Sequence, residues 1–139
     1  EFIIIDAPKL IEQIAEHKYQ LNLTFSPQGA AMQQKKAYKN CNVVAACYKE
    51  GPGHLWSMWA CIQNIALAAT AEGLGIVPST LWEEDQKAVE KLLGLPDGYK
   101  LATVVLVGVQ KGYPRAKTPQ IPRRAEFSWL HRNRFDTSA

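Results

Sequence analysis

The sequence predicts a single domain of mixed architecture, in which strands and helices alternate along the chain. Its 139 residues suit one domain. A hydrophobic fraction of 47% is enough for a core and argues against disorder. Short β-branched runs, typical of strands, alternate with longer segments whose apolar residues recur at helical spacing. The sequence contains no internal repeat and no clear linker.

The N-terminal part is expected to contain two strands and two helices. The β-branched run FIIID at 2–6 predicts a strand. Pro8 then suits the first position of a helix over 8–20, in which apolar residues repeat at helical spacing. A weaker helix is expected over 26–40, and the run NVVAACYK at 42–49 predicts a second strand.

A long helix is expected over about 55–71, after a Gly-Pro-Gly break, and it is apolar over most of its circumference. A membrane span is a poor interpretation, because Gln63 and Asn64 lie in its middle. We therefore expect a central helix covered by its own sheet on one side. A domain of this size has little left to cover the other side, so a partner subunit is expected there.

The long helix stops at Glu72-Gly73-Leu74-Gly75. Gly73 suits the positive φ of a helix C-terminus, and Gly75 permits close approach of a neighbour or a ligand. From the residues alone, two interpretations stay open. The glycines either simply end the helix and turn the chain, or they present backbone N–H groups to a planar heterocycle.

The remaining elements follow in order. GIVPS at 75–79 predicts a short strand or an extended turn. A helix is expected within 80–96, where Thr80 and Glu83 match a capping box. KLATVVLVGVQ at 100–110 is the longest strand candidate, and its apolar residues on both faces predict burial on both sides. The tail over 111–139 is basic and contains prolines, so an extended arm is expected.

The titratable and thiol residues indicate no metal site. Three cysteines are scattered without a CxxC pair or a histidine at ligand spacing, which favours a reducing cytoplasm over a disulfide framework. His17, His54 and His131 are isolated in the sequence and are interpreted as structural or surface residues. The aromatic and arginine-rich tail also fits a nucleic-acid-binding arm, but the net charge of +3 is low for that role.

Several segments together resemble one family. QNIALAATAEGLGIVPS, then LLGLPDGYKLATVVLVGVQKGYP, then an Arg-Arg pair before a C-terminal segment, are similar in order and spacing to the FMN-dependent nitroreductase family. The resemblance covers roughly Asn42 to Phe135, and FIIIDAPKLIEQIA resembles the family's early strand and helix. The LLGLP helix end followed by a strand that closes on GYP is the most distinctive piece.

The resemblance implies an α+β fold, with a mostly antiparallel sheet flanked by helices. It implies a homodimer in which the long central helix packs on its mate and the C-terminal arm embraces the other subunit. FMN would lie at the interface, with a backbone N–H of the Glu72-Gly73 turn near flavin N5. The segment from Gly75 to Ser79 would line the isoalloxazine ring. The full set of cofactor-binding residues expected on this basis is Glu72, Gly73, Leu74, Gly75, Pro78, Ser79, Arg123 and Arg124.

Arg123 and Arg124 are the expected phosphate partners, since a guanidinium pairs bidentately with phosphate. The function implied is hydride transfer from NAD(P)H through FMN to a nitroaromatic, a quinone or a similar small acceptor. No catalytic side chain, metal, nucleic acid or membrane is expected in this scheme.

The sequence departs from the family at its start. Members begin with an Arg-rich helix that holds the FMN phosphate, whereas this sequence starts at the strand that follows it. We therefore expect a single nitroreductase-like domain over 1–139 that lacks this first segment, as a shortened member or a fragment. The alternative is a catalytically impaired remnant that serves as a dimerisation or flavin-binding domain.

Overall fold

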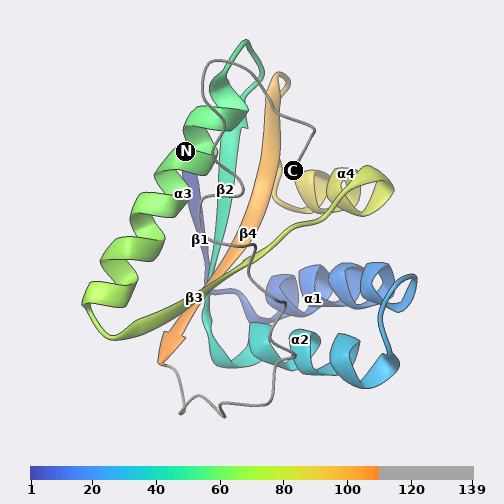
Figure 1. Cartoon of the computed structure of the whole chain (residues 1–139). Helices are drawn as coiled ribbons and strands as arrows, with labels where there is room; N and C mark the ends of the chain where they lie inside the picture. The colour runs from blue at the N-terminus through green and yellow to red at the C-terminus, as the bar shows by residue number, and fades with distance from the viewer. Residues whose placement is uncertain (110–139) are drawn as a thin grey trace, which may run out of the picture.

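The computed structural model describes residues 1–109, which form an antiparallel sheet with helices on both faces (Figure 1). The expected C-terminal arm, with Arg123, Arg124 and His131, lies outside the described residues. The elements in chain order are β1 (Phe2–Ile5), α1 (Pro8–Leu23), α2 (Gln28–Asn40), β2 (Asn42–Lys49), α3 (His54–Ala71), β3 (Leu74–Ser79), α4 (Glu83–Leu92) and β4 (Tyr99–Val109).

The sheet has four strands in the order β1-β2-β4-β3, and every neighbouring pair is antiparallel. This arrangement confirms the predicted α+β class with an antiparallel sheet. β4 lies between β2 and β3, and its residues from Leu101 to Leu106 are buried, as the apolar run on both of its faces predicted. β3 is an edge strand among the described elements, paired only with β4.

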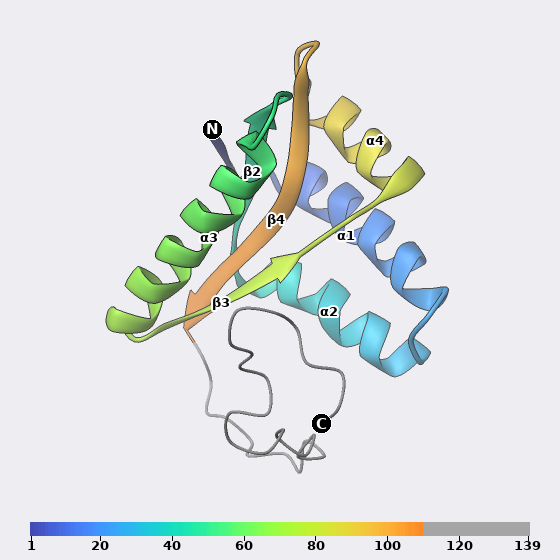
Figure 2. The ribbon, with the colours of Figure 1, turned by 45° about the horizontal axis from the view of Figure 1, so that its top comes forward.

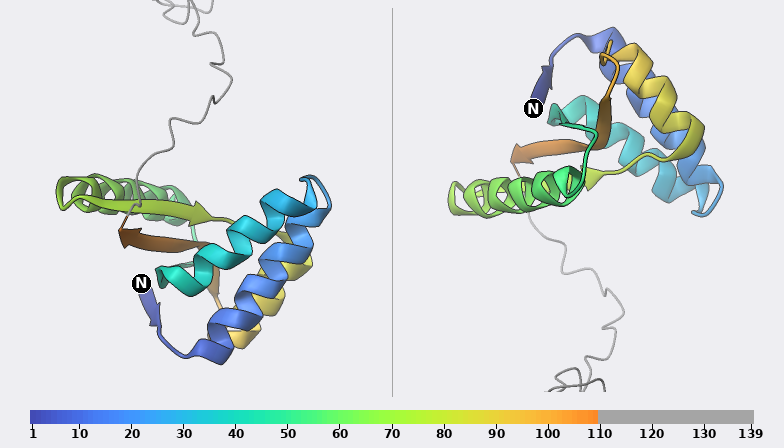
Figure 3. Two further views of the ribbon diagram at one scale, coloured as in Figure 1. Left: turned by 90° about the horizontal axis from the view of Figure 1, so that it is seen from below. Right: turned by 90° about the horizontal axis from the view of Figure 1, so that it is seen from above.

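The helices form two layers on opposite faces of the sheet. Of the described helices, α3 covers one face, while α1, α2 and α4 cover the other (Figures 2 and 3). Each face has its own core. On the α3 side Met58 and Ile62 pack against Ala46 and Val105. The larger core on the other side includes Ile14 of α1, Tyr38 of α2 and Val89 of α4.

α3 buries only one of its apolar faces against the sheet. Met58, Ile62 and Ala69 are buried, whereas Trp56 is 73% and Leu67 is 61% exposed. The expectation that a partner covers the second face stays a prediction. In the described part of the chain, no helix is long and apolar enough to cross a membrane.

The start of α4 differs from the capping-box prediction. The helix begins at Glu83 with Trp82 at its N-cap, and no side chain caps it. The hydroxyl of Thr80 instead lies 3.3 Å from the hydroxyl of Thr103 on β4. A tertiary contact with β4 therefore takes up the side chain that the local sequence pattern assigned to the helix cap. The helix end is as expected, because Gly94 follows it with a φ of 64°.

Candidate functional site

β3 carries four of the eight residues predicted to bind a cofactor, and it starts close to the end of α3. Gly73 has a φ of 72°, which confirms the left-handed conformation expected at the helix C-terminus. The N–H of Glu72 donates to Ala68 O and the N–H of Gly73 donates to Thr70 O, both at 3.1 Å. Both amides are thus used within the helix end. Their contact with a cofactor stays a prediction, and β3 itself is the better source of hydrogen-bond donors.

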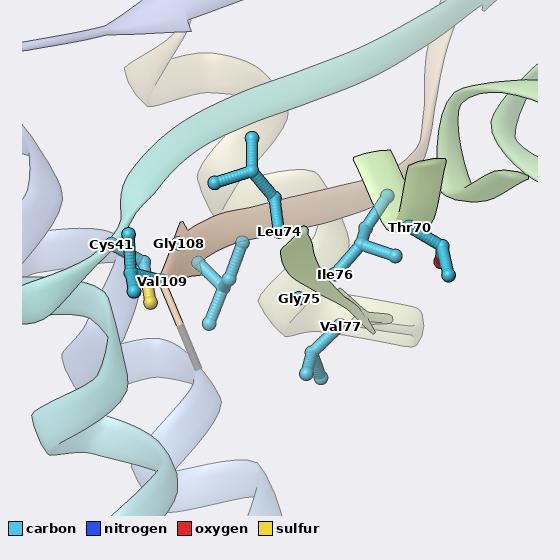
Figure 4. A pocket seen from close by; sticks show the side chains of 9 residues that line it. Cys41, Thr70, Leu74, Gly75, Ile76, Val77, Gly108 and Val109 are labelled. Atoms are coloured by element: carbon cyan, nitrogen blue, oxygen red, sulfur yellow. The ribbon is translucent and has the colours of Figure 1, made fainter. Parts of the chain in front are cut away.

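A pocket of about 400 Å³ lies between β3, β4 and the C-terminal end of α2 (Figure 4). Cys41 forms one wall beside Gly108 and Val109, while β3 forms the other wall. The residues that line it are Cys41, Thr70, Leu74, Gly75, Ile76, Val77, Leu106, Gly108 and Val109. The volume falls within the range of roughly 300–1,000 Å³ typical of small-molecule sites.

Two glycines leave space in this pocket. Gly75 on β3 pairs directly with Gly108 on β4, so their missing side chains lie on the same face of the sheet. A Cβ placed on Gly108 would lie only 3.1 Å from Cys41 Sγ. The pocket at this point would therefore be filled by any larger residue at position 108.

The chemistry of the pocket suits a planar group with an apolar face and a polar rim. Its lining is mostly aliphatic, and Thr70 and Cys41 provide its polar side-chain atoms. Because β3 is an edge strand, half of its backbone N–H and C=O groups point away from β4. These groups can bind the edge of a heterocycle while the aliphatic walls contact its face. The donor set therefore fits a flavin ring.

The other end of β3 is built differently. Pro78 is exposed, but Ser79 is 1% exposed and its Oγ accepts a hydrogen bond of 2.8 Å from Tyr38 OH. Burial raises the pKa of Tyr38 to about 12, although the bond to Ser79 acts in the opposite direction. The Ser79 side chain thus faces the core. Five strand steps separate Leu74 from Ser79, about 17 Å, so only an extended ligand can contact both ends.

The structure also forms contacts that the sequence did not indicate. His17 Nδ1 lies 3.0 Å from Asp85 Oδ1, although the two residues are separated by 68 positions, so His17 is not isolated. His54 Nδ1 lies 2.8 Å from Lys49 O at the start of α3, which fits the structural role expected for it. Among residues 1–109, no cluster of His, Cys, Asp and Glu could hold a metal ion.

Sequence reasoning missed Cys41 and Gly108 as pocket residues. A glycine inside an otherwise apolar strand is a known sign of close backbone approach, and Gly108 in the run VVLVGV carries that signal. Nothing comparable marks Cys41, which reaches the pocket only because α2 ends beside β4.

A family model and similar solved structures both point to nitroreductases. A family model described as the nitroreductase family matches residues 1–109. A protein of Parabacteroides distasonis described as an NADH dehydrogenase/NAD(P)H nitroreductase has a similar structure, with a TM-score of 0.69 and 25% identity over 97% of this chain and 73% of that one. No curated protein matches the sequence.

Two further solved structures share the fold at lower identity. An FMN-dependent nitroreductase of Clostridium difficile has a TM-score of 0.70 and 15% identity, over 97% of this chain and 75% of that one. An iodotyrosine deiodinase bound to FMN and 3-iodo-L-tyrosine has a TM-score of 0.62 and 22% identity, over 90% of this chain and 75% of that one.

Proposed function

This chain is a member of the nitroreductase family, and from that premise we propose that it is an FMN-dependent oxidoreductase of the cytoplasm. Its cofactor is FMN, and its transient electron donor is NAD(P)H. The acceptor is a nitroaromatic, a quinone or a similar small molecule. Bound FMN supplies the hydride chemistry, while the protein supplies orientation, hydrogen bonds and exclusion of water.

The pocket beside the Gly75–Gly108 pair is the observation that carries this proposal. Val77, on the same face of β3 as Gly75, supplies an aliphatic contact to the ring, and the outer edge of β3 supplies backbone hydrogen bonds to its rim. The aliphatic lining keeps bulk water from the reacting face. Glu72 and Gly73 lie at the start of this strand, and Pro78 and Ser79 at its far end.

The phosphate group of FMN needs cationic partners, and none of the described residues that line the pocket is cationic. Arg123 and Arg124 remain our proposed partners for it. A guanidinium pair binds a phosphate dianion through parallel N–H···O bonds. Replacement of both by glutamine is expected to weaken FMN binding clearly and to change the flavin spectrum only slightly.

We also propose that the active form is a homodimer built on α3. The outward face of this helix carries a stripe of exposed apolar residues at helical spacing, Trp56, Ala60, Leu67 and Ala71. A second copy of α3 would cover this stripe, which is otherwise left in water at a cost of about 25 cal/mol per Å². Such a contact is self-complementary about a twofold axis.

The test is reconstitution of the purified chain with FMN, followed by gel filtration and an absorbance spectrum. We expect flavin to co-elute with a dimer and to be reduced by NADH or NADPH. Electrons should then pass to a nitroaromatic or a quinone. A dimer that releases all added FMN would refute the enzyme and would favour a dimerisation domain without this chemistry.

A pair of matched variants separates the pocket from general effects. Val77 and Ile4 are both exposed apolar residues on edge strands, but only Val77 lines the pocket. Val77→Asp is expected to prevent FMN retention, because it places an anion in an aliphatic lining. Ile4→Asp should retain FMN. Equal retention by the two variants would exclude this pocket as the flavin site.

A further inference from the structure

Buried polar side chains gather at one point of the molecule, where the C-terminal end of β3 meets α1 and α2. Within residues 1–109 the buried polar or charged residues are Lys18, Asn22, Ser79 and Thr103. They come from one helix and two strands: Lys18 and Asn22 lie on α1, Ser79 on β3 and Thr103 on β4. Each is connected to Ser79 or Thr80 by hydrogen bonds, directly or through one further side chain.

The connections to Ser79 run through α2. Tyr38 OH donates to Ser79 Oγ at 2.8 Å, and Gln34 Nε2 donates to the same oxygen at 3.5 Å. The amide of Asn22 on α1 donates in turn to Gln34 Oε1. Tyr38 and Ser79 are 0% and 1% exposed, so water does not compete for the bond between them.

The connections to Thr80 come from α1 and β4. Lys18 Nζ donates to Thr80 O at 2.6 Å and lies 5.1 Å from the centroid of the Trp82 ring. The Thr103 hydroxyl lies 3.3 Å from the Thr80 hydroxyl. Burial lowers the pKa of Lys18, and the charge of Asp85 opposes that shift. Five residues thus surround Ser79 and Thr80, and we call them the Ser79–Thr80 clamp. They are Lys18, Asn22, Gln34, Tyr38 and Thr103.

A buried polar network of this kind is a poor way to gain stability. An apolar core of the same volume is often as stable, but a satisfied network fixes one geometry. β3 needs that help, because within residues 1–109 it is an edge strand that pairs with β4 alone. Pro78, next to Ser79, has no backbone N–H to contribute to the ladder.

We propose that Tyr38 is a positioning residue. Through its hydrogen bond to Ser79 it fixes the position of β3, the strand that faces the flavin, from the side of α2. Tyr38 does not contact the cofactor itself. Its hydroxyl holds the end of β3 against α2, and the outer edge of β3 is thereby held at one distance and angle to the ring. The proposal rests on the FMN function proposed above.

The experiment uses the FMN-reconstituted chain and three variants, Tyr38→Phe, Ser79→Ala and the double variant. Tyr38→Phe removes the donor hydroxyl but keeps the ring volume. FMN affinity, the visible flavin spectrum, kcat and KM are measured together with Tm. We expect Tyr38→Phe to raise the FMN dissociation constant about fivefold, the equivalent of one ordinary hydrogen bond. The flavin spectrum should shift as well.

Two controls separate positioning from stability. Val89→Ala lowers stability in the same core cluster without touching a hydrogen bond, so its Tm should fall while its flavin spectrum and KM stay unchanged. Tyr48→Phe removes a tyrosine hydroxyl on the α3 side of the sheet and should change neither the flavin spectrum nor KM. The double variant should be no worse than Ser79→Ala, because Ser79→Ala already removes the acceptor of both Tyr38 and Gln34.

The results distinguish the two proposals. If the wild-type chain binds FMN and Tyr38→Phe matches it in affinity, spectrum and kcat, the positioning role is refuted while the FMN function stands. A loss of Tm alone, as in Val89→Ala, refutes it equally. If the wild-type chain binds no FMN, the proposed function fails, and the positioning role fails with it.

Discussion

Gly108→Ala is the sharpest test of the pocket, because its effect depends on one neighbouring atom. The added Cβ would lie 3.1 Å from Cys41 Sγ, inside the 3.4–4 Å of an ordinary contact, while the Cα and Cβ of Cys41 are both at 3.7 Å. Forcing a methyl group into such a site costs about 1–3 kcal/mol. Replacing a strand glycine recovers about 0.5–1 kcal/mol of chain entropy. We expect a net loss of up to about 2.5 kcal/mol in the free energy of unfolding.

The same geometry predicts a rescue. Cys41→Ala removes the sulfur that the new methyl group meets, and the remaining contacts of 3.7 Å are ordinary. In this background Gly108→Ala should be neutral or slightly stabilising, so the two changes are coupled by about 1–2 kcal/mol. Urea denaturation of the wild type, both single variants and the double variant measures this coupling. Additivity within about 0.5 kcal/mol would show that Cys41 and Gly108 do not pack as described.

Three further predictions use independent features. Tyr38 has a pKa of about 12 against 10.0 in the unfolded chain, so the folded state binds more protons between these values and stability falls as pH rises through that window. Tyr38→Phe should abolish this loss, which is at most about 2.7 kcal/mol, in alkaline denaturation curves. Trp56→Glu together with Leu67→Glu, on the exposed face of α3, should yield monomers in sedimentation experiments, and an unchanged dimer would exclude this face. Glu90→Ala leaves the Leu101 N–H, now bonded at 2.8 Å, without its acceptor and should cost about 1.5–3 kcal/mol in urea melts. The exposed Glu84→Ala is its control and should cost less than about 0.5 kcal/mol.

Local patterns predicted the elements well, because each depends on residues close in sequence. Pro8 begins α1, Gly73 ends α3 with a positive φ, and the two-sided apolar run of β4 is buried on both faces. The capping box at Thr80 failed for the opposite reason. A hydroxyl from Thr103, 23 residues away, takes up the Thr80 side chain, and no local pattern could indicate that contact.

The candidate site could be predicted from the sequence only in part. The segment from Gly75 to Ser79 was selected from the sequence through a family resemblance, and its residues Gly75, Ile76 and Val77 line the pocket. The opposing wall was not found, since Cys41 and Gly108 belong to other elements. Ser79 was expected among the cofactor-binding residues, which stays a prediction, and its side chain bonds to Tyr38. Its orientation depends on α2, which no pattern in 75–79 specifies.

The sequence by itself determined the alternation of strands and helices, the ends of α3 and the burial of β4, because periodicity and backbone preference act over a few residues. It also determined family membership, through the order and spacing of its segments. Only the tertiary structure decided the strand order, and with it the pairing of Gly75 with Gly108 and the contact of Tyr38 with Ser79. These contacts join residues at least 33 positions apart, and they form because burying both faces of one sheet selects a single register.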